Sequence, residues 1–139
     1  MASFNKFNSF VEAIGKKVHN LNADTLKIML TNSAPSASNT VKTDITDISA
    51  GNGYTAGGTQ AASNSYAQSS GTAKLLANDV VFTASGGSIA SFRYAVLYND
   101  TATNKELIGW WDYGSSISPA SGETFTVDLD GTNGVLTIA

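Results

Sequence analysis

The fold is decided by residues 89–113, IASFRYAVLYNDTATNKELIGWWDY, whose alternation predicts two long β-strands joined by a polar turn. In the first strand, alternation puts Phe92, Tyr94, Val96 and Tyr98 on one face and Ile89, Arg93, Ala95 and Leu97 on the other. Both faces are largely apolar, so we expect a central strand that is covered on each side. The turn falls at residues 99–104, and the returning strand carries bulky groups on both faces from Leu107 to Tyr113.

Shorter strands are expected on either side of this hairpin. Residues 25–31 alternate as a strand, residues 71–84 give one or two strands, and residues 123–130 and 135–139 give two more. Crossover helices between them are missing from the pattern, which disfavours a parallel α/β sheet. We therefore predict one mainly β domain spanning residues 1–139, an antiparallel β-sandwich or barrel-like domain with one N-terminal α-helix and with core strands in residues 71–139.

The N-terminal segment, residues 1–22, is predicted to be that helix. Its apolar residues recur in steps of three and four, with Ser3 as a cap and an end near His19 or Asn20; they are Phe4, Phe7, Val11, Ile14, Val18 and Leu21. The same stripe fits a heptad seam, so the helix could pack on the domain's own sheet or on other copies of the chain. Its short length and Gly15 favour the domain's own sheet.

A long polar region, residues 32–70, separates the first strand from the core strands. It is rich in Ser, Asn, Thr, Ala and Gly, and contains AGNGYTAGG at residues 50–58. These glycines lack the Gly-Lys-Ser/Thr sequence and following helix of a phosphate loop, so they predict turns around Tyr54. Loops of this length are usually functional or mobile, and the region is a candidate contact surface.

Composition narrows the classes of partner. The net charge is −3, charged residues are 14% of the chain and Arg93 is the single arginine, which argues against nucleic acid as the main partner. The chain has no cysteine, which excludes disulfides and thiolate metal sites. No continuous apolar run marks a signal peptide or a membrane span, so we expect synthesis in the cytoplasm and no membrane partner.

Catalytic chemistry has little support in the sequence. The only histidine, His19, is expected at the surface or at a helix cap, and no spacing singles out a pair among the eleven carboxylates. Residues 128–134, DLDGTNG, resemble part of a calcium loop but lack its downstream glutamate, so a hairpin turn is favoured. We expect no enzymatic activity, no cofactor and no metal.

The adjacent tryptophans, Trp110 and Trp111, must face opposite ways in a strand. One ring can join the core. The other can then pack under a covering helix, or it can form an exposed platform for a carbohydrate or a subunit contact. Candidate partner-contact residues, taken from the helix, the polar region and this strand, are Phe4, Phe7, Val11, Tyr54, Tyr66, Trp110, Trp111 and Tyr113.

Four segments give the chain a resemblance in overall pattern to small structural proteins of tailed bacteriophages and prophages. They are AGNGYTAGG (residues 50–58), FTASGGSIASFRYAVLYND (82–100), LIGWWDYGSSI (107–117) and GETFTVDLDGTNGVLTIA (122–139). The resemblance implies a virion component: a capsid decoration (cement) protein, or a small tail or fibre subunit. It also implies other virion proteins as partners, the major capsid protein first, and a homo-oligomer in the assembled particle. A carbohydrate-binding module using exposed aromatics is the alternative from another class.

Overall fold

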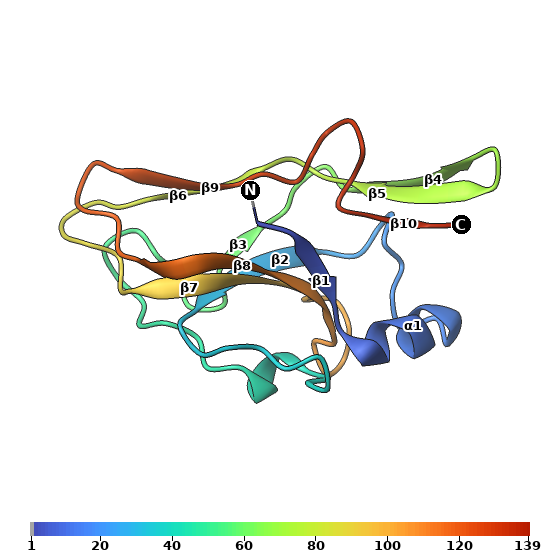
Figure 1. Ribbon diagram of the computed structural model, residues 1–139, viewed down its shortest axis with the longest axis horizontal. Coiled ribbons are helices and arrows are strands. Elements are labelled where there is room, and N and C mark those ends of the chain that lie inside the picture. The colour runs from blue at the N-terminus through green and yellow to red at the C-terminus, as the bar shows by residue number, and fades with distance from the viewer. Residues whose placement is uncertain (1) are drawn as a thin grey trace.

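The chain folds into two facing layers of antiparallel strands with one helix beside them (Figure 1). This computed structural model describes residues 2–139, so Met1, the first residue of the predicted 1–22 helix, lies outside the described residues. The mainly β, sandwich-like prediction is confirmed. The barrel-like alternative is not, because the layers do not close into a barrel.

The first layer is a five-stranded sheet in the order β1-β8-β7-β2-β3. Its strands are β1 (Phe4–Lys6), β8 (Leu107–Ile117), β7 (Phe92–Asn99), β2 (Leu26–Thr31) and β3 (Thr59–Gln60). The predicted hairpin forms the middle of this sheet, with Ala95 opposite Trp111 and Leu97 opposite Gly109. Every pairing in the layer is antiparallel, as the sequence pattern predicted.

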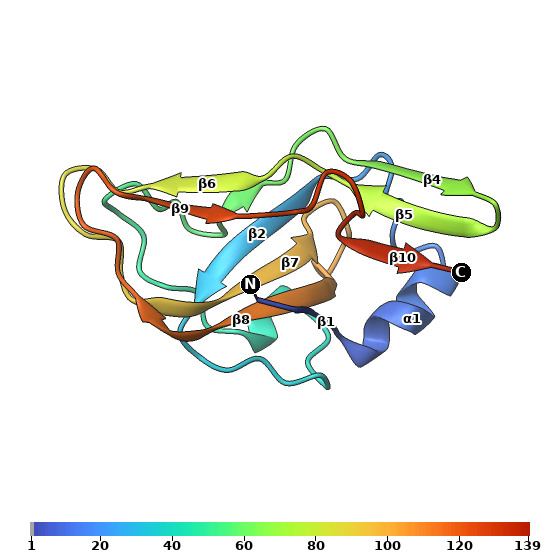
Figure 2. The ribbon, with the colours of Figure 1, turned by 45° about the horizontal axis from the view of Figure 1, so that its top comes forward.

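The second layer consists of two short sheets placed end to end (Figure 2). One has the order β10-β5-β4 and the other pairs β6 with β9; the strands are β4 (Ser65–Ser69), β5 (Thr72–Leu76), β6 (Val80–Thr83), β9 (Thr124–Val127) and β10 (Leu136–Ile138). The break between β5 and β6 contains the Asn78-Asp79 pair. There Asp79 Oδ1 accepts a hydrogen bond of 2.8 Å from the Leu129 amide, which links the segment before β6 to the segment after β9.

The main core lies between these two layers. It buries alternate residues of the facing strands and a few aromatic rings, including Ile28, Leu30, Leu75, Phe82, Phe92, Leu97, Trp111 and Val127. Phe92 meets the edge of Phe125 at 4.8 Å between ring centroids, and Phe4 meets Trp111 at 5.2 Å. Edge-to-face pairs of this kind add to the free energy gained from burial alone.

The outer face of the five-stranded sheet is covered by the first part of the long polar region, between β2 and β3, which runs beneath it in Figure 1. The expected loop at residues 32–70 is wrong toward its end, because Thr59–Gln60 forms β3 and Ser65–Ser69 forms β4 of the other layer. A second apolar cluster forms there from Phe7, Met29, Ile45, Val96, Tyr98 and Leu107, of which Ile45 belongs to the polar region. The region contains only a 3-10 turn, η1 (Lys42–Asp44), before β3. The expectation that β7 is covered on both sides is confirmed.

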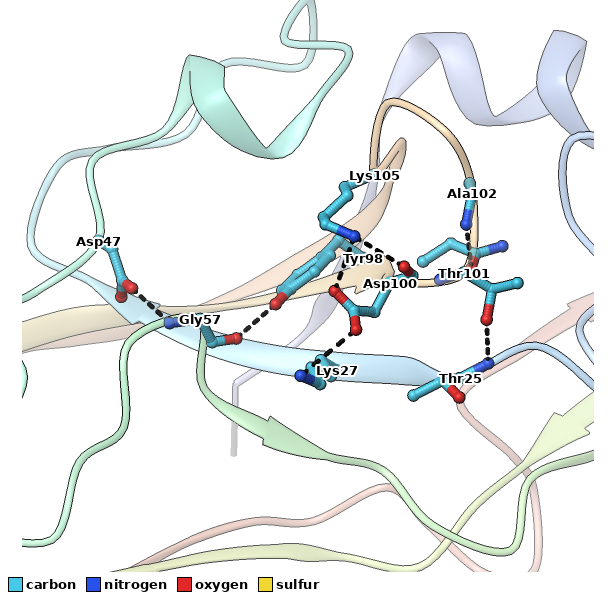
Figure 3. A network of polar contacts seen from close by, with 10 residues as sticks. Thr25, Lys27, Asp47, Gly57, Tyr98, Asp100, Thr101, Ala102 and Lys105 are labelled. Carbon is cyan, nitrogen blue, oxygen red and sulfur yellow. Dashed lines mark hydrogen bonds and ion pairs between the residues drawn. The ribbon is translucent and has the colours of Figure 1, made fainter.

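Hydrogen bonds fix the covering segment to the sheet (Figure 3). The Gly57 amide donates to Asp47 Oδ2 at 2.7 Å, and the Tyr98 hydroxyl donates to the Gly57 carbonyl at 2.5 Å. The Tyr54 hydroxyl donates to Asp47 and accepts from the Leu30 amide in β2. Burial, with the nearby Asp47 carboxylate, raises the pKa of Tyr54 well above its ordinary value, so the ring stays neutral.

The N-terminal prediction is wrong at both ends. Residues Phe4–Lys6 form β1 on the open edge of β8, and the helix α1 spans only Asn8–Gly15, with Phe7 in place of Ser3 as its cap residue. The helix stops because Lys17 adopts φ 65° and the Val18 amide donates to the Ala13 carbonyl at 3.0 Å, a Schellman ending. Of the two packing alternatives, Phe7 and Phe10 pack within the chain itself.

The predicted faces of β7 need one correction. Val96 and Tyr98 lie in the outer cluster as expected, but Phe92 belongs to the inner core with Ala95 and Leu97. The cause is an irregularity in the β7–β8 pairing, where Phe92 lies opposite Ile117 while Tyr94 lies opposite Asp112. A bulge of this kind turns the side chains beyond it to the other face.

Gly58 provides a test of how closely the covering segment approaches β2. It has φ +84°, and a Cβ there would lie 1.8 Å from the Ile28 carbonyl oxygen. Gly71, in the β4–β5 turn, has the same φ of +84° but nothing within 4 Å of its Cβ position. We expect Gly58→Ala to lower the free energy of unfolding by about 3–5 kcal/mol, through clash and strain combined.

The matched control, Gly71→Ala, should cost only about 1–2 kcal/mol, because it carries the conformational strain without the clash. Urea unfolding of the two variants beside the parent chain measures both values. Equal costs at the two positions would show that close approach at Gly58 is not a constraint.

Candidate functional site

The eight predicted contact residues differ in how far their side chains are buried. Phe7, Tyr54 and Trp111 are core residues, so their side chains offer no surface to a partner in this structure, and hydrophobic packing explains them. Four are partly exposed, namely Phe4, Tyr66, Trp110 and Tyr113. Val11 is the most exposed of the set, at 55%.

The two tryptophans face opposite sides of β8, as predicted. Trp111 packs in the main core against Phe4, while Trp110 lies on the other side against Phe7, 4.6 Å between ring centroids. Tyr113 is also engaged, edge-to-face with Phe125, and burial raises its pKa to about 12. Because these rings are held against neighbours, a carbohydrate platform built from them stays a prediction that the packing does not favour.

An apolar groove of about 390 Å³ lies between β1, α1 and β10. Its lining is apolar apart from Lys6 and Thr137; the other members are Phe4, Phe10, Val11, Ile14, Leu136 and Ile138. Val11 and Ile138, at 55% and 37% exposure, are two of the three large hydrophobic side chains exposed among the described residues. Two of the predicted contact residues, Phe4 and Val11, therefore come together at one surface.

Two strand edges flank the apolar groove. Among residues 2–139, β1 pairs with β8 alone and β10 pairs with β5 alone, so each has one edge with unused backbone donors and acceptors. Apolar side chains beside a free edge match the requirements for adding a strand from another chain. This arrangement can bind a protein segment without any catalytic group.

A second site surrounds His19, which is buried and not at the surface as predicted. The buried Asn99 at the end of β7 holds it in place. Asn99 Oδ1 accepts hydrogen bonds from the Thr101 and Ala102 amides at 3.0 and 3.1 Å, so its Nδ2 faces the other way. That Nδ2 donates to Asp24 Oδ2 at 2.7 Å and lies 3.0 Å from His19 Nδ1.

This arrangement fixes the tautomer of the ring. An amide nitrogen can only donate, so His19 Nδ1 must accept, and the proton of the neutral imidazole lies on Nε2. Burial lowers the pKa of His19, while the carboxylates of Glu106 and Asp24 act in the opposite direction. The ring of Phe10 packs 5.5 Å away and keeps water from one side.

His19 and Glu106 both line a polar groove of about 740 Å³, which lies between α1, the following loop, Tyr66 and the β7–β8 turn. His19 Nε2 and Glu106 Oε2 are buried and have no hydrogen-bond partner among residues 2–139. Sequence reasoning missed this site because no local motif links position 19 to positions 99 and 106. The available signal was Asn99-Asp100-Thr101 at a strand end, which predicted only the turn.

No family model, no curated protein and no solved structure matches this chain. Within residues 2–139, no group of three or more His, Cys, Asp or Glu side chains is placed to hold a metal ion. Nor does that part of the chain contain a helix with the length and apolar character needed to cross a bilayer. The two grooves are therefore the candidate functional sites.

The buried His19 predicts a pH-dependent stability. The unfolded chain takes up a proton at the ordinary histidine pKa of about 6.5, whereas the folded pKa is lower. The unfolded state thus binds more protons as pH falls, and this contribution to stability, present above about pH 6.5, is lost below it. For one proton the slope is at most about 1.4 kcal/mol per pH unit.

Urea unfolding at pH 7.5 and 5.5 tests this prediction, with His19→Gln as the variant that cannot titrate. The parent chain should lose more stability between the two pH values than the variant does, since the carboxylates are common to both. Parallel pH profiles for the two proteins would contradict a buried neutral His19.

Proposed function

We propose that this chain is a non-enzymatic structural subunit of a bacteriophage virion, a decoration (cement) protein that binds the head surface. The observation that carries the proposal is the apolar groove, with Val11 and Ile138 exposed between two unpaired strand edges. Exposed apolar patches of this type mark protein contacts in soluble proteins. The resemblance of the sequence pattern to tailed-phage structural proteins supplies the kind of assembly.

The rest of the surface suits a subunit that stays soluble before assembly. Charged residues are few, the net charge is −3, and the long segment covering the outer sheet face presents mainly Ser, Thr, Asn and Gly to solvent. Partners under this proposal are the major capsid protein and, around a symmetry axis of the lattice, other copies of the chain. The groove between β1, α1 and β10 is where we expect the capsid contact.

Val11→Asp combined with Ile138→Asp tests this assignment. Two carboxylates in the groove would have to be desolvated on binding, so incorporation into particles should fall at least tenfold, equivalent to about 1.4 kcal/mol or more. Quantitative mass spectrometry of purified virions measures the copy number. The matched control is Val81→Asp, because Val81 is 50% exposed but lies on β6, outside the groove.

Cryo-EM of the same particles locates the chain. Density on the head surface, with the β1, α1 and β10 side toward the capsid, is the expected result. Density in the tail or fibre would replace decoration with the other virion role, and purified virions without this polypeptide would end the proposal altogether.

A further inference from the structure

The open edge of β1 presents a defined set of backbone groups. The Phe7 amide donates to the Ile108 carbonyl of β8 at 3.2 Å, which continues the β1–β8 register by one residue. Along an antiparallel strand, residues that bond to one neighbour alternate with residues whose backbone groups point to the opposite side. Asn5 and Phe7 therefore bond toward β8, whereas the N–H and C=O groups of Phe4 and Lys6 point toward the open edge.

These groups remain open to another chain. Within residues 2–139, β8 is the only strand that pairs with β1. Phe4 is partly exposed and Lys6 is exposed, so the edge meets solvent. Each of the two residues offers one backbone donor and one acceptor, which an added strand can satisfy. A helix bound at the same place would leave them unpaired, because its backbone bonds are internal.

The side chains beside this edge face the apolar groove between β1, α1 and β10 (Figure 2). Phe4 and Lys6 are two positions apart, so they lie on one face of the strand, and both line the groove with Val11 and Ile138. A strand added to β1 places every second side chain on this same face. Apolar residues at those positions would cover the exposed Val11 and Ile138.

The charge in the groove specifies one further residue of the added strand. Lys6 is the single charged residue that lines the groove, and no carboxylate lines it. Among residues 2–139, Lys6 forms no ion pair. A carboxylate directly opposite Lys6 would pair with it, and at an exposed site such a pair fixes the register more than it adds affinity.

We propose that the apolar groove binds an extended segment of another protein, which adds to β1 as an antiparallel strand and carries a carboxylate between two apolar residues at alternate positions. The carboxylate lies opposite Lys6, one apolar side chain lies opposite Phe4, and the other extends toward Val11 and Ile138. The inference rests on the proposed function, because the segment would belong to the head protein that this chain decorates.

Selection of random peptides of about ten residues on the immobilised full chain tests the pattern without any particle. Enriched peptides should share the alternation apolar, any residue, Asp or Glu, any residue, apolar. An enriched peptide is then synthesised with a fluorescent label, and its Kd for the parent chain and for variants is measured by fluorescence anisotropy.

Two substitutions at Lys6 separate the backbone from the charge. Lys6→Gln keeps the outward N–H and removes the charge, so the Kd should rise no more than about fivefold, as for an exposed ion pair. Lys6→Pro also removes the N–H and should raise the Kd at least about tenfold further. The fold should tolerate this proline, because the lost N–H points away from β8.

Thr124→Pro is the matched control. The Ala84 amide donates to the Glu123 carbonyl at 2.9 Å, so by the same alternation the Thr124 N–H points to the free edge of β9. That edge lies outside the apolar groove, and the Kd should stay unchanged. Thermal unfolding by circular dichroism confirms that each variant is folded.

Amide hydrogen exchange by NMR tests the strand contact without any substitution. In the free chain, the Phe4 and Lys6 amides should exchange faster than the Asn5 amide, which β8 already protects. Saturation with the selected peptide should slow the exchange of the first two amides at least about tenfold.

Four results would overturn the proposal. They are a selection that enriches no alternating pattern, a Lys6→Pro variant that binds as tightly as Lys6→Gln, a Lys6→Gln variant that binds more tightly than the parent, and amides of Phe4 and Lys6 that bound peptide leaves unprotected. The third result would show that Lys6 keeps the edge closed. Dimerisation of the chain that Lys6→Pro abolishes, without peptide binding, would instead assign the edge to a second copy.

The virion assignment is decided separately. If purified virions lack the polypeptide, that assignment ends, while the peptide measurements still decide whether β1 accepts a strand. If the chain is present in virions but these measurements fail, it decorates the head through another contact.

Discussion

The double-sided burial of β7 is the constraint on which the rest of the structure depends. Seven of its eight residues are buried, so each face of the strand needs an apolar cover. The second β layer covers one face. The other is covered by the segment between β2 and β3, which has little regular secondary structure and contributes Ile45 to the outer cluster. A segment so rich in Ser, Asn and Gly cannot hold this position by hydrophobic contact alone.

Polar contacts provide the additional attachment of the covering segment. Asp47 receives the Tyr54 hydroxyl and the Gly57 amide, Tyr98 reaches the Gly57 carbonyl, and Thr31 donates to the Thr46 carbonyl at 2.5 Å. These bonds satisfy groups that burial would otherwise leave unpaired. The bonds from Tyr98 and Thr31 run between the sheet and the covering segment, whereas the two bonds to Asp47 lie within the segment and fix its shape. The region expected to be a partner-binding loop is therefore first a structural cover, and the two grooves lie elsewhere, around α1.

Both grooves depend on the path of the N-terminal segment, which the sequence pattern did not predict. Because residues Phe4–Lys6 extend along β8, Phe4 lies over Gly109, where a Cβ would come within 2.2 Å of its ring, and Phe7 reaches the outer face. The helix that follows is short, and its ending at Lys17 returns the chain past His19 to Asn99. The apolar groove forms on one side of this helix and the polar groove beyond its end.

The sequence by itself determined the antiparallel β class, the central hairpin, strand β2, the opposed tryptophans and a turn at Asp130–Gly134, because alternation and turn residues act over a few neighbouring positions. The expected hairpin at that last turn is wrong, because β9 pairs with β6 and β10 pairs with β5 in a different sheet. Only the tertiary structure decided that Phe4–Lys6 is a strand, since the three- and four-residue spacing of Phe4 and Phe7 also fits a helix until the free edge of β8 is present. It likewise decided the bulge at Phe92 and the burial of His19. The sequence named Phe4 and Val11 as contact residues but could not assemble either candidate site, because residues 19, 99 and 106, or 11 and 138, meet only through long-range contacts that no local pattern encodes.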